Sequence, residues 1–134
     1  MIYTVIDTNV IVAALISKYD DAATVQIITK VFTGDLTPVY SESILAEYKD
    51  VLQRPKFKFP PDDQEYIISA IKNFGKPVIP IPSLITMPDV KDLPFYEAAK
   101  ALPNCYLITG NKKHFPDDSF IVSAREMLDI LATC

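Results

Sequence analysis

Short runs of β-branched and apolar residues alternate with helical patterns along the whole chain, and this alternation is what most restricts its fold. The first apolar run, residues 2–6, is followed by helical spacing over 10–16, and the pattern continues to a last helix over 123–131. Strands that alternate with helices form mostly parallel sheets covered by helices. The sequence therefore predicts an α/β protein, a three-layer α/β/α sandwich with a mostly parallel five-stranded sheet.

The five expected strands cover residues 2–6, 37–40, 78–81, 105–109 and 119–122. The third of these contains Pro80, which has no N–H to donate to a ladder, so it is expected at the edge of the sheet. At least five helices lie between and after the strands. Ser41 and Gly75 stand where a helix is expected to begin and to end, respectively.

Composition indicates an ordinary globular protein. With 134 residues, 49% of them hydrophobic and 22% charged, the chain is expected to form a single domain over 1–134. No apolar run approaches the roughly 18 residues of a membrane span. The first residues lack a basic region and Asp7 interrupts their apolar stretch, so they do not resemble a signal peptide. A cytoplasmic location is expected.

The two cysteines do not have the spacing of a metal site. Cys105 falls in an expected buried strand and Cys134 is the last residue. We interpret them as a core thiol and a tail thiol in a reducing compartment.

The first strand ends at an acid. Asp7 follows the apolar run at the point where the strand gives way to a helix. Ligands of open α/β sheets bind at the carboxyl ends of the strands, and a carboxylate there can hold Mg²⁺ or Mn²⁺. Asp7 can equally be the N-cap of the following helix. From its position alone, both interpretations stay open.

Three further residues could join Asp7 at the same edge, each with an ordinary alternative. Glu47 lies near the apolar face of the helix that follows the second strand, although a solvated helix glutamate is the commoner case. Asp92 begins the helix that contains Pro94, where a capping role also explains it, and Asp89 is its nearby rival. Asn111 follows the fourth strand, where it can orient a water or simply form a turn.

The net charge of −4 argues against strong binding to a phosphate backbone, which depends on Lys and Arg. Two features weaken this objection. Bound metal can neutralise several acids, and basic residues cluster at 54–58 and 112–114.

Five motifs follow one another in a recognisable order: VIDTNV at residues 5–10, SESILAEY at 41–48, RPKF at 54–57, DLPFYEAA at 92–99 and LITGN at 107–111. Their order resembles that of the PIN domain, in particular the bacterial PIN-family toxins of toxin–antitoxin systems. The resemblance extends from residue 2 to about residue 130. It implies a PIN-like fold and a metal-dependent ribonuclease of the VapC-like kind, with Mg or Mn as cofactor.

The resemblance also implies roles for individual residues. Asp7, Glu47 and Asp92 match the family's metal-binding acids, which carry catalysis. Thr8, Asn9 and Thr109 match the polar residues that support them. Asn111 stands where many members have a fourth aspartate, so it would hold a second metal less well. Three neighbours lie close enough in sequence to substitute in part: His114, Asp117 and Asp118.

A toxin of this family implies an RNA substrate, a small antitoxin as partner and a homodimer, with no membrane involved. The main alternative is a degenerate PIN module that binds RNA or a protein without cleavage. An acid-pocket phosphatase usually has a second aspartate at the position of Asn9, and three glycines cannot form the fingerprint of a dinucleotide-binding domain.

Overall fold

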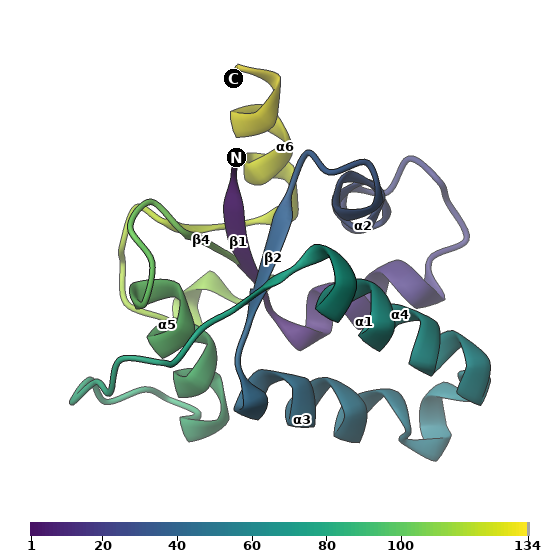
Figure 1. Ribbon diagram of the computed structural model, residues 1–134, viewed down its shortest axis with the longest axis horizontal. Coiled ribbons are helices and arrows are strands. Elements are labelled where there is room, and N and C mark those ends of the chain that lie inside the picture. Colours follow the sequence, from purple (N-terminus) through teal and green to yellow (C-terminus); the bar gives the residue numbers. More distant parts are fainter. Residues whose placement is uncertain (134) are drawn as a thin grey trace.

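The computed structural model describes residues 1–133 and contains a five-stranded sheet in the centre of the molecule (Figure 1). The strands are β1 (Tyr3–Ile6), β2 (Thr37–Tyr40), β3 (Lys76–Pro77), β4 (Tyr106–Ile108) and β5 (Ile121–Val122). They lie in the order β3-β2-β1-β4-β5, and every pair of neighbours is parallel. The expected α/β fold with a parallel five-stranded sheet is confirmed.

The strand order changes direction at β1. From β1 the chain builds outward to β2 and β3, and it then returns to the other side of β1 to add β4 and β5. A reversal of this kind leaves a crevice outside the carboxyl ends of the two strands that flank it, here β1 and β4, and ligands of doubly wound sheets bind there.

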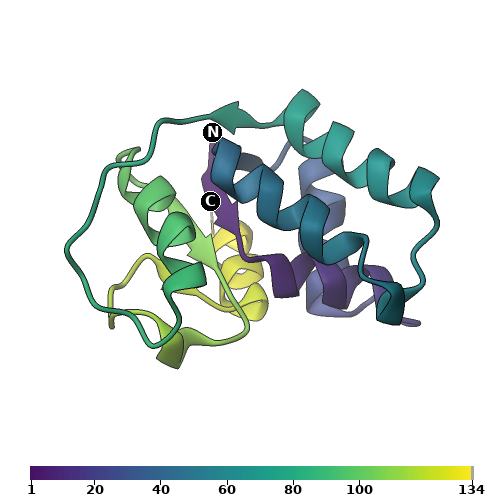
Figure 2. The same cartoon turned by 90° about the horizontal axis from the view of Figure 1, so that it is seen from below.

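Helices cover both sides of the sheet, as Figures 1 and 2 show from two directions. They are α1 (Thr8–Ile16), α2 (Ala23–Phe32), α3 (Glu42–Leu52), α4 (Pro61–Phe74), α5 (Leu93–Lys100) and α6 (Ala124–Ala132), with short 3-10 helices η1 (Pro55–Phe57), η2 (Val90–Asp92) and η3 (Lys112–His114). Helix α2 packs against α1 and α6, while α5 lies against β1, β2 and β4. The core between the layers contains the fully buried Ile6, Ile44, Phe95 and Met127.

The third strand is not where the sequence predicted it. Residues 78–81 form no strand, and β3 consists of Lys76 and Pro77. The reason lies in its partner, because β2 ends at Tyr40 and Ser41 already caps α3. After Val78 donates to the carbonyl of Tyr40 (2.8 Å), no strand remains for residues 79–81 to pair with. The expectation of an edge position was right, since β3 is the outermost strand.

Gly75 explains how β3 can begin directly after α4. A side chain at this position would collide with the carbonyl oxygens of Ile71 and Pro38. The end of α4 and the backbone of β2 therefore approach more closely than any other residue would permit.

The remaining boundaries differ by a few residues at most. Strands β4 and β5 are shorter than predicted, and α6 begins after Ser123, which forms a reciprocal capping box with Glu126. Cys105 is buried, as expected, and burial raises the pKa of its thiol to about 12. Cys134 lies outside the described residues. Across residues 1–133, no helix is long and apolar enough to cross a membrane.

Candidate active site

Asp7 lies at the reversal point of the sheet. Its backbone N–H donates to the carbonyl of Ile108 (2.9 Å), which ties the end of β1 to the end of β4. Its side chain is only 5% exposed, and one carboxylate oxygen accepts a hydrogen bond from the hydroxyl of Thr109 (2.7 Å). Asp7 occupies the N-cap position of α1 but accepts no capping bond of normal geometry. Its carboxylate is thus engaged across the sheet rather than along the helix.

The environment of Asp7 disfavours its negative charge. Burial raises the pKa of this carboxyl above its usual value, since a charge loses solvation when it leaves water. The hydrogen bond from Thr109, the first amides of α1 and the imidazole of His114 lower the pKa but do not cancel the effect of burial. A buried carboxylate with this imbalance is stabilised by any cation that can reach it.

A cavity of about 240 Å³ lies over Asp7 and brings together acids from three parts of the chain. Glu47 comes from the middle of α3, while Asp89 and Asp92 come from the two sides of η2. The full lining is Asp7, Thr8, Asn9, Glu47, Val51, Arg54, Lys56, Phe57, Asp89, Lys91, Asp92 and Phe95. The cavity therefore contains the three acids that the resemblance implied.

Asp92 also titrates far from its ordinary range. Its pKa is raised to about 6, first by burial and then by the negative charges of Asp7 and Asp89. The Nδ1 atom of His114 lies 3.6 Å from its carboxylate and offsets part of the shift. Acids that raise one another's pKa share a negative field, and perturbed groups of this kind concentrate at functional sites.

The chemistry of this donor set fits a hard divalent cation held partly through water. The hydroxyl of Thr8 is buried beside Asp7 and has no hydrogen-bond partner among the described residues. Within residues 1–133, no three acidic, histidine or cysteine side chains converge closely enough to hold a metal by themselves. Mg²⁺ does not require such a cage, because it usually binds one or two carboxylates and keeps several waters. Asp7 with Asp92 or Glu47 would supply that number.

The polar residues that were expected to support the acids divide into two groups. Thr8 and Asn9 line the cavity, and Thr109 binds Asp7 directly. Asn111 is tied to this network only by its backbone N–H, which donates to the hydroxyl of Thr109 (3.0 Å). Its side chain is not among those that line the acidic cavity.

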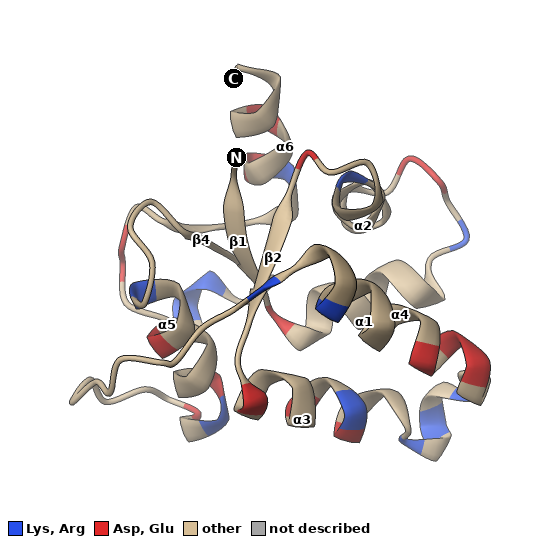
Figure 3. Ribbon diagram, viewed as in Figure 1, with Lys and Arg blue, Asp and Glu red and all other residues tan. Residues whose placement is uncertain are grey.

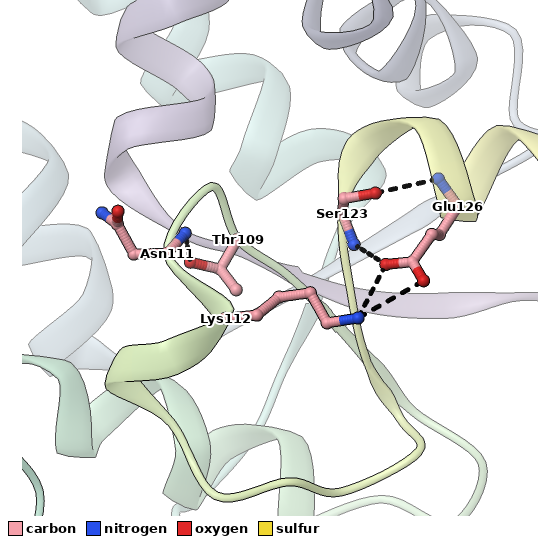
Figure 4. Close-up of polar contacts among 5 residues, drawn as sticks. All are labelled: Thr109, Asn111, Lys112, Ser123 and Glu126. Atoms are coloured by element: carbon pink, nitrogen blue, oxygen red, sulfur yellow. Dashed lines mark hydrogen bonds and ion pairs between the residues drawn. The ribbon is translucent and has the colours of Figure 1, made fainter.

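The side chain of Lys112 extends toward α6 (Figure 4). Lys112 forms an ion pair with Glu126 (3.0 Å), the acid of the α6 capping box, while the side chain of Asn111 points away from this pair. Asp117 and Asp118 line a separate hollow of about 460 Å³, and Asp118 accepts a hydrogen bond from Tyr96 (2.9 Å). Of the three possible substitutes for a fourth acid, only His114 contacts an acid of the cavity.

Tyr48 of α3 was not among the predicted site residues, but its hydroxyl contributes to the site. The ring is fully buried and the hydroxyl donates to the carbonyl of Ile6, the residue before Asp7. Because the hydroxyl of a buried tyrosine usually has a hydrogen-bond partner, the sequence could have indicated a polar role for Tyr48. The sequence indicated the basic cluster at 54–58 as a feature that favours phosphate binding but did not place it beside the acids, where Arg54, Lys56, Phe57 and Lys91 line the cavity.

A doubly wound parallel sheet with an acid-lined cavity at its reversal point defines an α/β protein with a candidate ligand site at the carboxyl ends of its strands. The comparison with protein families is more specific. The model of the PIN domain family matches residues 3–113, and the chain belongs to this family. PIN domains are generally nucleases, act on RNA and usually bind divalent metals. A search of curated proteins found no match.

Proposed function

We propose that this protein is a metal-dependent endoribonuclease that uses Mg²⁺ or Mn²⁺. The observation that carries the proposal is the cavity at the sheet reversal, where Asp7, Glu47 and Asp92 line one space. The raised pKa values of Asp7 and Asp92 support it further, because they indicate negative charge that the surrounding protein leaves uncompensated.

In this proposal each residue has a defined task. Asp7 holds the cation from the end of β1, with its carboxylate oriented by Thr109. Asp92 and Glu47, which line the same cavity, would bind the cation as well, directly or through water. A bound divalent cation would activate water for attack on phosphorus and offset the charge on the departing oxygen.

We further propose the toxin role that the motif order implies. The partner would then be a small antitoxin, and the protein would act as a homodimer in the cytoplasm, as a single PIN-like domain. Support comes from membership of the PIN family and from the RPKF segment at residues 54–57, which lies beside the acidic cavity.

Asp7→Asn tests the proposed activity most simply. Cleavage of RNA by the purified protein with Mg²⁺ or Mn²⁺ should fall to background in this variant, while circular dichroism stays unchanged. Asp20→Asn is the matched control. Asp20 is exposed in the turn before α2, so this substitution removes the same charge outside the cavity. Undiminished cleavage by Asp7→Asn would refute the assignment.

The second candidate is a PIN module that binds RNA or a protein without cutting. It is favoured by the side chain of Asn111, which does not line the cavity, and by the spacing of the described acids, which form no three-residue metal group. Binding of RNA by wild-type protein without any cleavage in Mg²⁺ or Mn²⁺ would support this candidate.

A further inference from the structure

The acidic cavity has a second kind of lining that the acids do not explain. Three cations border the same space, Arg54 and Lys56 from the connection between α3 and α4, and Lys91 from η2. Figure 3 shows the blue residues that gather where α3 ends, beyond the red residues along that helix. Positive charge beside an acidic centre is what a substrate with a phosphate backbone requires.

An aromatic pair lies within this basic group. Phe57 lines the cavity, and its ring stacks on that of Phe59 with centroids 5.4 Å apart and an interplanar angle of 12°. The ammonium of Lys56 lies over the Phe57 ring, 5.0 Å from its centroid. Both rings are half-buried, so each keeps part of its surface in contact with solvent. A half-exposed stacked pair with a lysine ammonium over one ring is a platform on which a planar ring can bind.

We infer that Phe57, together with Arg54, Lys56 and Lys91, forms a subsite for single-stranded RNA. We call these four residues the strand rim, after the RNA strand that they would bind. An unpaired base stacks on Phe57 in the place of the Lys56 ammonium, which moves to a neighbouring phosphate. Arg54 and Lys91 bind further phosphates, so that the strand passes over the acids. The inference rests on the proposed function, since it assigns the residues that would hold the RNA strand at that site.

The strand rim selects for unpaired RNA. Bases in an A-form duplex are stacked on their neighbours and cannot stack on Phe57 until the helix opens, whereas bases in a loop or single strand are free to do so. Stacking on an aromatic ring also depends little on which base is present. We therefore expect strong preference for single strands over duplexes and weak preference among bases.

The rim also accounts for how a chain with a net charge of −4 can bind a polyanion. Three cations lie at one cavity beside its acids, and the field that an RNA strand meets there depends on where the charges lie rather than on the total charge of the chain. Each phosphate contact on a single strand contributes about −0.7 to the slope of log affinity against log salt. Three contacts predict a slope of about −2.

Tryptophan fluorescence provides a direct test, because the chain has no tryptophan of its own. Phe57→Trp keeps a stacking ring and adds a reporter, and the Asp7→Asn background prevents cleavage of the probe. A short single-stranded oligouridylate should quench the fluorescence saturably, and a blunt RNA duplex of equal length should not. Phe74→Trp is the control, since Phe74 is exposed at the end of α4 and packs on Phe32 away from the cavity.

Affinity measurements separate stacking from charge. In the same background, Phe57→Leu should weaken oligouridylate binding about tenfold and leave the salt slope unchanged. Lys56→Gln should instead make the salt slope less negative by about 0.7, because one phosphate contact is lost. Thermal unfolding of each variant shows whether it is folded, and binding restored by Phe57→Trp would exclude a purely structural effect.

Quenching by single strands alone, with this separation of the two variants, supports the strand rim. Equal quenching in the Phe74→Trp control, equal binding of duplex, or wild-type affinity in Phe57→Leu would overturn it, and so would binding of peptide but not RNA at this surface. Failure of the proposed function is distinguishable, because wild-type protein would then not cleave RNA in Mg²⁺ or Mn²⁺, whatever the binding result.

Discussion

The two ends of the acidic cavity are built in different ways. The acid end has its buried centre where β1 and β4 stop, with Asp7 at 5% and Thr109 at 1% exposure, while Glu47 and Asp92 join it from α3 and η2. The strand rim comes from surface segments, with Arg54, Lys56 and Phe57 in or beside η1 and Lys91 in η2. Lys56 is exposed and Phe57 half-buried, and Arg54 forms a surface ion pair with Asp50 (3.3 Å).

This difference shows that the location of a residue in the fold is matched to its proposed role. Groups that must keep a fixed geometry belong on rigid, buried elements, while contacts with a flexible polymer can be made by surface segments. Substitutions at the acid end should therefore alter both stability and chemistry. Substitutions at the rim should alter binding alone.

The largest loss of activity is expected from substitution of the two acids that share the cavity with Asp7. Asp92→Asn and Glu47→Gln should each lower kcat for RNA cleavage by more than about 100-fold, because loss of groups that only support a metal ligand already costs about 10–100-fold. Steady-state cleavage assays at saturating Mn²⁺ measure the change. Glu42→Gln on the first turn of α3 serves as the control, and wild-type rates in Glu47→Gln would remove that residue from the site.

A smaller effect should follow when the carboxylate of Asp7 loses its orienting hydrogen bond. Thr109→Val removes the hydroxyl that lies 2.7 Å from Asp7 and should lower Mn²⁺ affinity or activity about 10–100-fold. Thr109→Ser keeps the hydroxyl and should restore most of the loss. If Val and Ser variants behave alike, the hydrogen bond has no functional role.

The titration of Asp92 predicts how stability depends on pH. Its folded pKa of about 6 lies above the ordinary value of 3.8, so the folded protein binds the proton more tightly than the unfolded chain. The free energy of unfolding should therefore fall as pH rises from about 4 to about 6 and then level off. Asp7, Asp89 and His114 are the charged groups that act on it.

Asp92→Asn should remove this penalty. In the absence of metal, the variant should be more stable than wild type by about 3 kcal/mol at neutral pH and by almost nothing at pH of about 4. Urea unfolding at both pH values measures the difference. A variant that is less stable than wild type at neutral pH would contradict the conclusion that burial and repulsion destabilise the ionised Asp92.

The smallest effect on stability and activity is expected from Tyr48, which supports the backbone just before Asp7. Tyr48→Phe removes the hydrogen bond to the carbonyl of Ile6 and should cost about 1 kcal/mol of stability, as is usual for one buried hydrogen bond. Cleavage should be reduced only slightly, since the ring still packs on Phe95. Tyr66→Phe, on the exposed face of α4, should change neither quantity.

Much of the fold was predictable because local patterns and the global arrangement agree. The apolar run that ends at Asp7, the Ser41 cap and the Ser123 cap each carry a local signal that the structure contains. The third strand was misplaced because its position depends on where β2 ends and on the close approach at Gly75. Both are properties of the partner strand and are invisible in residues 78–81.

The candidate site was predictable to a lesser degree. The acids Asp7, Glu47 and Asp92 could be chosen from motif order, and they do line one cavity. The position of Asn111 could not be foreseen, because it depends on how Lys112 reaches Glu126 across the loop. The role of Phe57 also required the structure, since only packing shows that the α3–α4 connection borders the acids.

Titration with Mn²⁺ by calorimetry tests the central claim most directly. Wild-type protein should bind Mn²⁺ saturably near neutral pH, and Asp7→Asn should bind it at least about tenfold more weakly, because the carboxylate at the sheet reversal carries the site. Asp20→Asn should bind as wild type does. Absence of saturable binding by wild-type protein, or equal affinity in Asp7→Asn, would contradict the claim that these acids form a metal site.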